Sequence, residues 1–455
     1  MHTDVIAAIA TGLVPGGIGI IRISGTDAVR TAERVVKIRN VRLSEAKPRY
    51  LYYGFVCDGE KCLDEALIVF MRAPHSYTAE DTVELQCHGG PLVLKRVLAA
   101  VIKAGARLAE PGEFSKRAFL NGRLDLSEAE AVMDLIRAEN DFARETALSQ
   151  LGGSLSEAVG GLRGQILEET AFIEAALDDP EHISLDGYPE RLRPKLQAMI
   201  GTVETLLAGS ENGRRLADGI PTAILGRPNV GKSSLLNALL GEERAIVTPI
   251  AGTTRDTIEE TLRLGDVLLH LSDTAGLRET GDAVERIGVE RAEQKARESE
   301  LILYVLDGAE GLGEKDREAL TALKDRRCII LINKSDLPQV IDPQEVERET
   351  GMETLRTSAK TGEGLKELQE AVERRFLFGE IRHQPLVVTN LRHQELLRET
   401  LEALHRVQES LELGMPEDFF SVDFMEAYRS LGLILGEEAD EDLINEIFGK
   451  FCLGK

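Results

Sequence analysis

The sequence has few cysteines and no apolar run long enough to span a bilayer. Five cysteines in 455 residues, an odd and sparse number, argue against a disulfide framework and favour a reducing compartment. The first residues, Met1–Asp4, carry no basic segment of the kind that opens a signal peptide. We therefore expect a cytoplasmic protein with no membrane partner.

Basic residues are also scarce relative to acidic ones. The 54 Lys and Arg residues face 78 Asp and Glu residues, which gives a net charge of −24. An acidic surface repels phosphate backbones, so indiscriminate binding to nucleic acid is excluded. Any contact with RNA must use a local basic patch or a partner that carries the charge. Internal repeats and low-complexity segments are also lacking.

The length predicts about three domains at roughly 150 residues each. Short β-branched or aromatic segments bounded by Gly, Pro or Asp predict a strand-rich first domain over residues 1–119, which includes a helix at Pro91–Ala104. We expect an α+β fold there. The predicted strands are Val5–Ala10, Ile18–Ile23, Tyr50–Val56, Ala66–Met71 and Thr82–Cys87.

Long helical patterns follow, and they return near the end of the chain. Ser127–Glu130 resembles a capping box, and apolar periodicity continues from Ala131 to Phe142. Further helices are predicted at Leu155–Leu177, Leu192–Leu207, Ser421–Leu435 and Asp440–Phe451, and Gly209–Gly213 is predicted to be a junction. We expect one discontinuous all-α domain, in two parts over 120–212 and 380–455.

Between these two parts, strands and helices alternate from Ile220 to Phe378, which is typical of a parallel sheet covered by helices. Its first loop, Gly226–Ser233, has the pattern G-x-x-x-x-G-K-S between an apolar strand and a helix. Backbone N–H groups of such a loop surround phosphate oxygens. Lys232 would reach the β and γ phosphates, and the Ser233 hydroxyl would bind Mg²⁺.

Three further motifs follow in order, each after a predicted strand, where ligands of α/β sheets bind. The first, Asp273-Thr274-Ala275-Gly276, offers a carboxylate that binds Mg²⁺ through water. The second, Asn333-Lys334-Ser335-Asp336, offers a carboxylate that accepts from guanine N1–H and its 2-amino group, which adenine lacks. The third, Ser358-Ala359-Lys360, would support the base. The combination predicts an inserted Ras-like α/β G domain over 213–379 that binds GTP.

The residues that complete catalysis are less clear from these patterns. Within Gly252–Asp256, Thr254 is our choice to complete the Mg²⁺ shell, with Thr253 as the alternative. Leu277 stands where Ras-type enzymes have a water-orienting Gln. A downstream carboxylate (Asp282, Glu285 or Glu290) or an arginine (Arg255 or Arg278) could replace it.

Motifs outside the G domain carry a more specific resemblance. They are Gly17–Gly25, Tyr77–Asp81, Glu84–Pro91, Pro111–Phe114, Arg117–Asp125 and Phe451–Lys455. With these motifs the chain resembles, over essentially its whole length, the MnmE (TrmE) family of tRNA-modification GTPases, in the TrmE-Era-like superfamily. The resemblance implies an N-terminal domain that binds folate and dimerises.

The resemblance also assigns roles within the G domain. It implies a K⁺ ion held by Asn229, Thr248, Ile250 and Thr253, which draws two G domains together and replaces an arginine finger. It places the catalytic glutamate at Glu285, which would orient the attacking water through other waters. The GTP site it implies comprises Asn229, Val230, Gly231, Lys232, Ser233, Ser234, Thr248, Pro249, Ile250, Ala251, Gly252, Thr253, Thr254, Asp273, Thr274, Ala275, Gly276, Asn333, Lys334, Asp336, Ser358, Ala359 and Lys360.

A second implied site would take a tetrahydrofolate derivative, 5-formyl- or methylene-tetrahydrofolate. It carries over to Arg22, Glu80, Arg123 and Lys455, where a carboxylate suits the pteridine edge and cations suit the glutamate tail. The family's terminal cysteine falls on Cys452, with an implied role in modification. Two departures are Arg123, where relatives usually have Lys, and Asp179, where they tend to have Phe.

The implied function is GTP hydrolysis coupled to modification of C5 of the wobble uridine, U34, of tRNA. The product is an aminomethyl or carboxymethylaminomethyl derivative, made by a homodimer with an FAD-dependent partner, MnmG (GidA). Two alternatives share the P-loop: a ribosome-assembly GTPase and a purely regulatory GTP switch. The former usually carries a basic RNA-binding appendage, which this acidic chain lacks.

Overall fold

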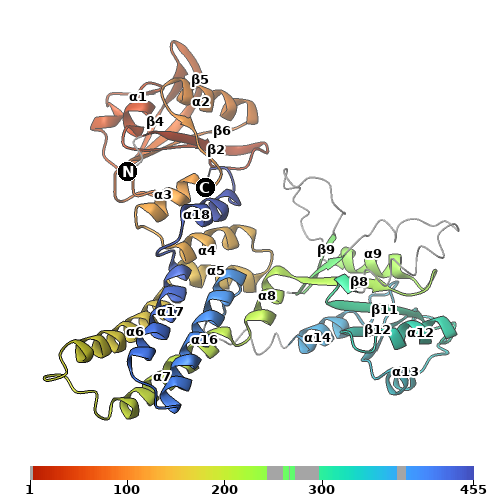
Figure 1. The fold of residues 1–455 in the computed structure, drawn as a ribbon. Coiled ribbons are helices and arrows are strands. Elements are labelled where there is room, and N and C mark those ends of the chain that lie inside the picture. The colour runs from red at the N-terminus through yellow and green to blue at the C-terminus, as the bar shows by residue number, and fades with distance from the viewer. Residues whose placement is uncertain (1–3, 243–259, 266, 272–296, 377–385, 455) are drawn as a thin grey trace. The chain divides into compact units, whose positions relative to one another are not determined.

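The computed structural model describes residues 4–242, 260–265, 267–271, 297–376 and 386–454 (Figure 1). Contacts divide the chain into two compact units. The first comprises Met1–Ile136, Ser149–Gln197 and Glu399–Lys455, and the second comprises Arg137–Leu148 and Ala198–Arg398. Each unit is therefore assembled from segments that lie far apart in the sequence.

The N-terminal part of the first unit is a seven-stranded sheet with the order β3-β4-β5-β6-β2-β1-β7. All neighbouring strands are antiparallel except β1 and β7, and the five strands predicted from the sequence are confirmed. The elements are β1 Ile6–Ile9, β2 Gly16–Ser24, α1 Ala28–Glu33, β3 Val36–Ile38, η1 Leu43–Glu45, β4 Leu51–Asp58, β5 Lys61–Met71, β6 Thr82–Gly89, α2 Pro91–Lys103, β7 Arg107–Leu108 and α3 Glu113–Leu120.

One face of this sheet carries the core of the N-terminal part. Alternate residues of each strand point to the same face, so Ile21 and Ile23 of β2 lie on the face that also holds Leu85 of β6. Helix α2 contributes Leu94 and Val97 to the same cluster, as its 3.6-residue apolar spacing predicts. The sequence pattern therefore gives both the strands and the face on which α2 packs.

Helices from both ends of the chain pack together in the first unit. These are α4 Leu126–Arg137, α6 Ser154–Asp178, α17 Asp418–Leu435 and α18 Glu441–Gly449. Leu126 and Met133 of α4 share a buried cluster with Phe448 of α18 and with Phe451. Across α6 and α17, Arg163 donates to Glu437 at 2.5 Å and lies over the Tyr428 ring. These contacts agree with the predicted discontinuous helical domain.

The capping box of α4 lies two residues earlier than predicted. The Glu128 N–H donates to Asp125 Oδ1 at 2.8 Å, and the Asp125 N–H donates to Glu128 Oε2 at 3.0 Å. Ser127 is the second residue of the helix and donates its hydroxyl to Asp125. The prediction at Ser127 was wrong because the helix begins at Leu126, which puts Asp125, a strong cap, at the position before it and Ser127 inside the first turn.

Another helical prediction also needs correction. The periodicity from Ala131 to Phe142 is not one helix, because α4 ends at Arg137 and Asn140 caps the next helix, accepting from the Ala143 N–H at 2.7 Å. Helix α8 begins at Ser210, so most of Gly209–Gly213 is helical, and the domain junction predicted there stays a prediction. Three further helices have residues in both units: α5 Asp141–Leu151, α7 Tyr188–Leu207 and α16 Leu391–Glu412. Helix α8, Ser210–Asp218, lies within the second unit. Helix α7 therefore starts before the predicted Leu192.

The second unit contains a six-stranded sheet with the order β13-β12-β11-β8-β10-β9. Its strands are parallel except β9, which pairs antiparallel with β10 because only residues 265–266 separate them, too few for a crossover. Its elements are β8 Ile220–Leu225, α9 Lys232–Glu242, β9 Glu260–Leu264, β10 Val267–Leu271, β11 Leu301–Asp307, α12 Glu314–Ala322, β12 Cys328–Asn333, α13 Pro343–Thr350, β13 Thr354–Arg356 and α14 Leu365–Arg375.

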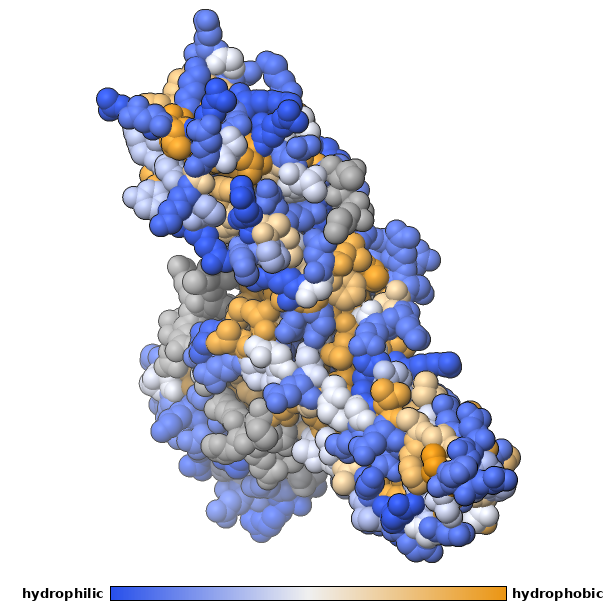
Figure 2. Space-filling view, turned by 90° about the vertical axis from the view of Figure 1, so that its left-hand side faces the viewer, coloured by the Kyte–Doolittle hydropathy of each residue, from blue (hydrophilic) through white to orange (hydrophobic). Residues whose placement is uncertain are grey.

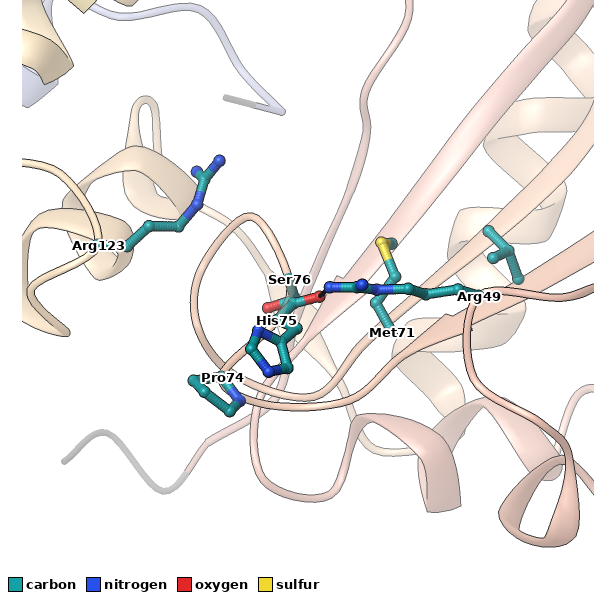
Figure 3. Close-up of a pocket in the computed structure, with 7 residues that line it drawn as sticks. Arg49, Met71, Pro74, His75, Ser76 and Arg123 are labelled. Atoms are coloured by element: carbon teal, nitrogen blue, oxygen red, sulfur yellow. Dashed lines mark hydrogen bonds between the residues drawn. The ribbon is translucent and has the colours of Figure 1, made fainter. Parts of the chain in front are cut away.

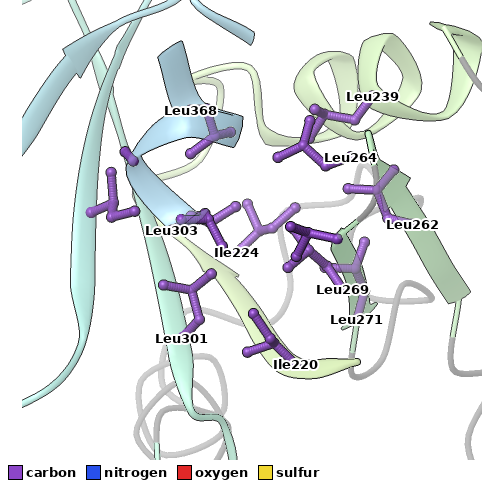
Figure 4. Close-up of a cluster of buried hydrophobic side chains, with 14 of the residues drawn as sticks. Ile220, Ile224, Leu239, Leu262, Leu264, Leu269, Leu271, Leu301, Leu303 and Leu368 are labelled. Atoms are coloured by element: carbon purple, nitrogen blue, oxygen red, sulfur yellow. The ribbon is translucent and has the colours of Figure 1, made fainter. Parts of the chain in front are cut away.

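Both faces of this sheet are buried, as a continuous apolar strand requires. Leu301 and Leu303 of β11 point to one face, where Leu368 of α14 packs (Figure 4). Ile302 and Tyr304 point to the opposite face and join a separate cluster. No helix in the part of the chain that the structure describes is both long and apolar enough to cross a membrane.

Candidate functional site

The loop between β8 and α9 has the backbone geometry that its two glycines permit. Gly226 has a φ of 141° and Gly231 a φ of 97°, which side chains rarely adopt. A Cβ at Gly226 would lie 2.3 Å from the Val305 carbonyl oxygen, and one at Gly231 would lie 2.3 Å from Asn333 Nδ2. Only glycine fits at either position, so the loop is held close to β11 and to the end of β12.

The Lys232 side chain binds back to the start of this loop. Its Nζ donates to the Gly226 carbonyl oxygen at 2.8 Å and to that of Arg227 at 2.6 Å. Burial lowers the pKa of the Lys232 ammonium, because desolvation penalises its charged form. A phosphate anion in the loop would stabilise that charge. Ser233 and Ser234 follow in the first turn of α9, both exposed, and Asn229 is exposed in the loop with a φ of 64°.

Asn333, the last residue of β12, links the loop Gly226–Ser233, called the phosphate loop below, to the third motif, Ser358–Lys360. It is 1% exposed, and its Nδ2 donates to the Val230 carbonyl oxygen at 2.9 Å. Its Oδ1 accepts from the Ala359 N–H at 3.1 Å. The nitrogen and the oxygen of the Asn333 amide therefore hold two separate loops, one through Val230 and the other through Ala359.

Asp336 faces the third motif as well. The Ser358 hydroxyl donates to Asp336 Oδ1 at 2.8 Å, and Lys360 Nζ lies 4.0 Å from Asp336 Oδ2. Lys334 has a φ of 66° and its Nζ lies 2.5 Å from Oδ2 of Asp307, the buried last residue of β11. The structure thus brings the phosphate loop, the Asn333–Asp336 segment and the Ser358–Lys360 segment to the carboxyl edge of the sheet.

Several predicted residues lie outside the described residues. They are Thr248, Pro249, Ile250, Ala251, Gly252, Thr253, Thr254, Asp273, Thr274, Ala275, Gly276, Glu285 and Lys455, with the alternatives Arg255, Arg278, Asp282 and Glu290. In the described part of the chain there is no group of three or more His, Cys, Asp or Glu side chains placed to hold a metal.

In the N-terminal part of the first unit, Tyr77 brings two predicted site residues together. The Arg22 guanidinium lies 5.2 Å from the Tyr77 ring centroid, and that of Arg123 lies 4.9 Å from it. Arg22 Nε also donates to Glu84 at 2.9 Å, but its Nη1 is buried without a hydrogen-bond partner in the structure as described. A buried donor of this kind is costly unless something binds to it.

Glu80, the third predicted residue, belongs to a buried charge network that the sequence did not reveal. Ser24 Oγ donates to Glu80 Oε2 at 2.8 Å, and Arg117 Nη1 lies 3.2 Å from the same oxygen. Arg117 is 1% exposed and also pairs with Asp4 and Glu113. Arginine is suited to this role because its planar group can serve several carboxylates at once.

A cavity of about 650 Å³ lies beside Arg123. It is lined by Arg49, Val69, Met71, Pro74, His75, Ser76 and Arg123 (Figure 3). The Arg49 guanidinium donates to the His75 carbonyl oxygen at 3.2 Å, whereas Arg123 extends from the loop after α3. Neither Arg22 nor Glu80 lines this cavity.

The C-terminal residues lie against the same N-terminal sheet. A Cβ at Gly454 would lie 2.3 Å from the carbonyl oxygen of Ile9 in β1, so the chain end approaches that strand closely. The Cys452 carbonyl oxygen accepts from the Gly112 N–H at 3.4 Å, and its side chain is exposed. Cys452 therefore lies beyond α18, in the segment that places the chain end near β1.

His88, on β6, has a carboxylate partner on β5. The ring Nδ1 of His88 lies 2.7 Å from Oδ1 of Asp64, and the backbone N–H of His88 donates to Oδ2 of the same carboxylate at 2.7 Å. The hydrogen bond to Asp64 raises the pKa of the His88 imidazole. His393 is buried and also partnered, since Arg392 Nη2 lies 2.9 Å from its Nε2.

Comparisons with known proteins place these features in a family. The model "GTP-binding protein TrmE N-terminus" matches residues 5–123, and "MnmE helical domain" matches residues 126–452. A "tRNA modification GTPase MnmE" of Lachnoclostridium phytofermentans is 51% identical over 100% of both chains. The chain belongs to the MnmE family of tRNA-modification GTPases.

Other MnmE proteins agree over a similar length. The protein of Lactococcus lactis subsp. lactis is 45% identical over 99% of this chain and 98% of its own. That of Clostridioides difficile is 44% identical over 99% of both chains. The solved G domain of the T. maritima FeoB iron transporter covers 34% of this chain and 97% of its own, at 28% identity and a TM-score of 0.26. The predicted multidomain MnmE architecture is confirmed, while the exact boundaries of its domains stay predictions.

Proposed function

We propose that the protein hydrolyses GTP, dependent on K⁺, to support modification of C5 of the wobble uridine in tRNA. The observation that carries the nucleotide specificity is the Asp336 carboxylate, fixed by Ser358 at 2.8 Å beside the segment that Asn333 ties to the phosphate loop. Two carboxylate oxygens can accept two N–H groups from guanine. Adenine offers no such pair of donors, so an adenine nucleotide bound there would leave both carboxylate oxygens without base partners.

The phosphate loop fits a triphosphate with its metal ions. Gly226 and Gly231 allow the loop a backbone conformation that other residues rarely adopt, in which its N–H groups can face phosphate oxygens. On binding, Lys232 would exchange the Gly226 and Arg227 carbonyl oxygens for phosphate oxygens. Ser233, Thr254 and, through water, Asp273 would hold Mg²⁺, and Asn229, Thr248, Ile250 and Thr253 would hold K⁺. Bound there, these ions would neutralise charge on the phosphates.

Hydrolysis also needs an oriented water. Leu277 has no polar group that could orient it, so the proposal assigns this task to Glu285, which acts through other waters. The positive charge that an arginine finger supplies in other GTPases would come from K⁺.

A tetrahydrofolate derivative is proposed to bind Arg22, Glu80, Arg123 and Lys455. Two features support it: the unpaired buried Nη1 of Arg22, and the common contact of Arg22 and Arg123 with Tyr77. Guanidinium groups suit the carboxylates of a folate tail, and the Glu80 carboxylate, oriented by Ser24 and Arg117, suits a pteridine edge. Bound folate would supply the one-carbon unit, and Cys452 is proposed to take part in the modification.

The N-terminal sheet offers a surface for the proposed homodimer. Tyr53 and Phe55 of β4 and Leu67 of β5 are 57%, 41% and 40% exposed, on the face opposite the core. Tyr53 lies directly across from Leu67, and the Tyr53 and Phe55 rings are 5.7 Å apart. Clustered exposed apolar side chains of this kind mark interaction sites.

The proposed FAD-dependent partner, MnmG, would complete the complex and carry much of the contact with tRNA. The net charge of −24 supports this division of labour. The face drawn in Figure 2 is mostly hydrophilic, with smaller hydrophobic areas between.

Nucleotide hydrolysis tests the first step of this proposal. We expect GTP to be hydrolysed and ATP not, with a rate at least roughly tenfold higher in K⁺ than in Na⁺, since a fitted cation contributes more than about 1.4 kcal/mol to the barrier. Asn229→Ala should remove the difference between the salts and leave the slow Na⁺ rate unchanged. Equal rates in the two salts for the unaltered protein would contradict the K⁺ assignment.

A further inference from the structure

Two of the five cysteines face each other across the β4–β5 hairpin. The strand register pairs Cys57 with Cys62 and Asp58 with Lys61, which leaves residues 59–60 as the turn. Paired residues in an antiparallel ladder point to the same face. Cys57 and Cys62 therefore form a cross-strand pair one step from the turn.

The hydrogen-bond pattern shows which kind of pair this is. The Cys57 N–H donates at 2.7 Å to the Val35 carbonyl oxygen, on the side of β4 away from β5. Cys57 and Cys62 therefore form a non-hydrogen-bonded pair, in which Cα atoms lie about 4.5 Å apart and side chains are closest. That separation lies within the range of about 4.4–6.8 Å that a disulfide spans.

The two thiols also influence each other. Burial raises the pKa of the Cys57 thiol, Lys37 opposes that shift, and the neighbouring Cys62 thiol adds to it. Because the paired positions already lie within the range of a disulfide, no large backbone movement is needed to bring the two sulfurs together.

Only one of the pair is open to solvent. Cys62 is exposed, whereas Cys57 is 5% exposed. An oxidant would therefore meet Cys62 first, and Cys57 is positioned behind it to resolve the product. This is the arrangement of an attacking and a resolving thiol.

We propose that Cys57 and Cys62 are a reversible oxidation site that closes to a disulfide across the β4–β5 hairpin. With oxidised glutathione, the Cys62 thiolate attacks one sulfur, forms a mixed disulfide and releases one glutathione thiolate. The Cys57 thiolate then attacks the Cys62 sulfur and releases the second glutathione. Two protein thiols and one glutathione disulfide become one protein disulfide and two glutathione thiols.

The site is separate from the proposed nucleotide and folate chemistry. Its disulfide would fix the register of the two strands that carry Tyr53, Phe55 and Leu67. The end of this hairpin is already held to α2, since Lys103 Nζ lies 2.8 Å from Asp58 Oδ1. A sparse cysteine content does not conflict with this, because disulfides in reducing compartments are usually transient or redox-sensing.

Trypsin provides a direct readout, because cleavage after Lys61 separates the two cysteines onto peptides 50–61 and 62–72. The full chain would be treated with oxidised glutathione, alkylated, digested without reductant and examined by mass spectrometry. We expect a linked peptide pair that dithiothreitol separates, with joint loss of alkylation at Cys57 and Cys62.

Single variants separate the two roles. Cys57→Ser should leave a stable glutathione adduct on Cys62, and Cys62→Ser should leave Cys57 alkylated only after unfolding. Cys452 is the matched control, since it is exposed, and Cys452→Ser should form the linked pair as the unaltered protein does. An unaltered protein that accumulates the Cys62 adduct without the linked pair, as Cys57→Ser does, would overturn the proposal. Neither result depends on GTP hydrolysis.

Discussion

The Asn333 amide holds the phosphate loop through Val230, to whose carbonyl oxygen it donates at 2.9 Å. The same amide fixes Ala359, so both loops depend on one buried side chain. Asn333→Ala would leave the buried groups unpaired, at about 1–3 kcal/mol. We expect GTP and GDP affinity to fall roughly 5- to 150-fold, measured by equilibrium binding of a fluorescent nucleotide.

The control for that change is Asn237→Ala, which alters an exposed asparagine of the adjacent helix α9. It should bind nucleotide as the unaltered protein does. If Asn333→Ala also binds GTP and GDP with unchanged affinity, the link between the two loops has no role in the site.

Asp336→Asn should change which base is preferred. An Asn amide can accept from N1–H but must donate at the second position, which suits the carbonyl at C2 of xanthine and opposes the 2-amino group of guanine. The substitution removes the charge from one hydrogen bond to guanine and replaces the other with a repulsive contact. We therefore expect the preference for GTP over XTP to fall by at least roughly a hundredfold. Competition binding measures it, with Asp325→Asn, an exposed position of the same domain, as control. A retained preference for GTP would refute the base-readout assignment.

The sequence predicts those parts of the nucleotide site whose positions follow from the ends of the strands before them. The carboxyl ends of β8 and β12 lie at one edge because their strands are parallel to β11, which lies between them. Motifs directly after those strands, Gly226–Ser233 and Asn333–Asp336, must therefore meet there. A local apolar pattern is enough to predict this much.

Contacts fixed by strand register or by competing local groups are not visible in such patterns. His88 meets Asp64 because β5 and β6 are neighbours in the sheet, with Leu67 opposite Gln86, which brings the segments next to that pair close together. The cap of α4 falls on Asp125 because the helix begins at Leu126, and the polar residues on either side of that start do not show which of them is the cap. Likewise, the contacts of Arg22 and Arg123 with Tyr77 join three segments that are distant in sequence.

Glu285 is predicted to act on catalysis more than on binding. Glu285→Ala should lower kcat of GTP hydrolysis by roughly a hundredfold or more, while nucleotide affinity changes little, because an oriented water matters chiefly in the transition state. Single-turnover kinetics and binding would be measured on the same preparation. Glu290→Ala is the matched control, since Glu290 is one of the two alternative carboxylates, with Asp282. If Glu290→Ala lowers kcat and Glu285→Ala does not, Glu290 and not Glu285 orients the attacking water.

The His88–Asp64 pair predicts a pH dependence. The hydrogen bond to Asp64 raises the pKa of His88 above the ordinary value of 6.5. The pair therefore stabilises the fold fully below pH 6.5, and this contribution is lost as the pH rises through the raised pKa. NMR titration of the imidazole should show a pKa above 6.5, which Asp64→Asn lowers and the control Asp58→Asn does not. An unchanged His88 titration in Asp64→Asn would contradict the assigned cause.

The nucleosides of tRNA provide the most direct test of the proposed function. A strain that lacks its own MnmE family protein would be complemented with this chain or with its Asp336→Asn variant, and wobble uridines would be examined by mass spectrometry. The unaltered chain should restore the C5-substituted uridine at position 34, and the variant should not when GTP is the available nucleotide. Unmodified uridine at position 34 in cells that contain the folded, GTP-hydrolysing chain and its FAD-dependent partner would contradict the proposal.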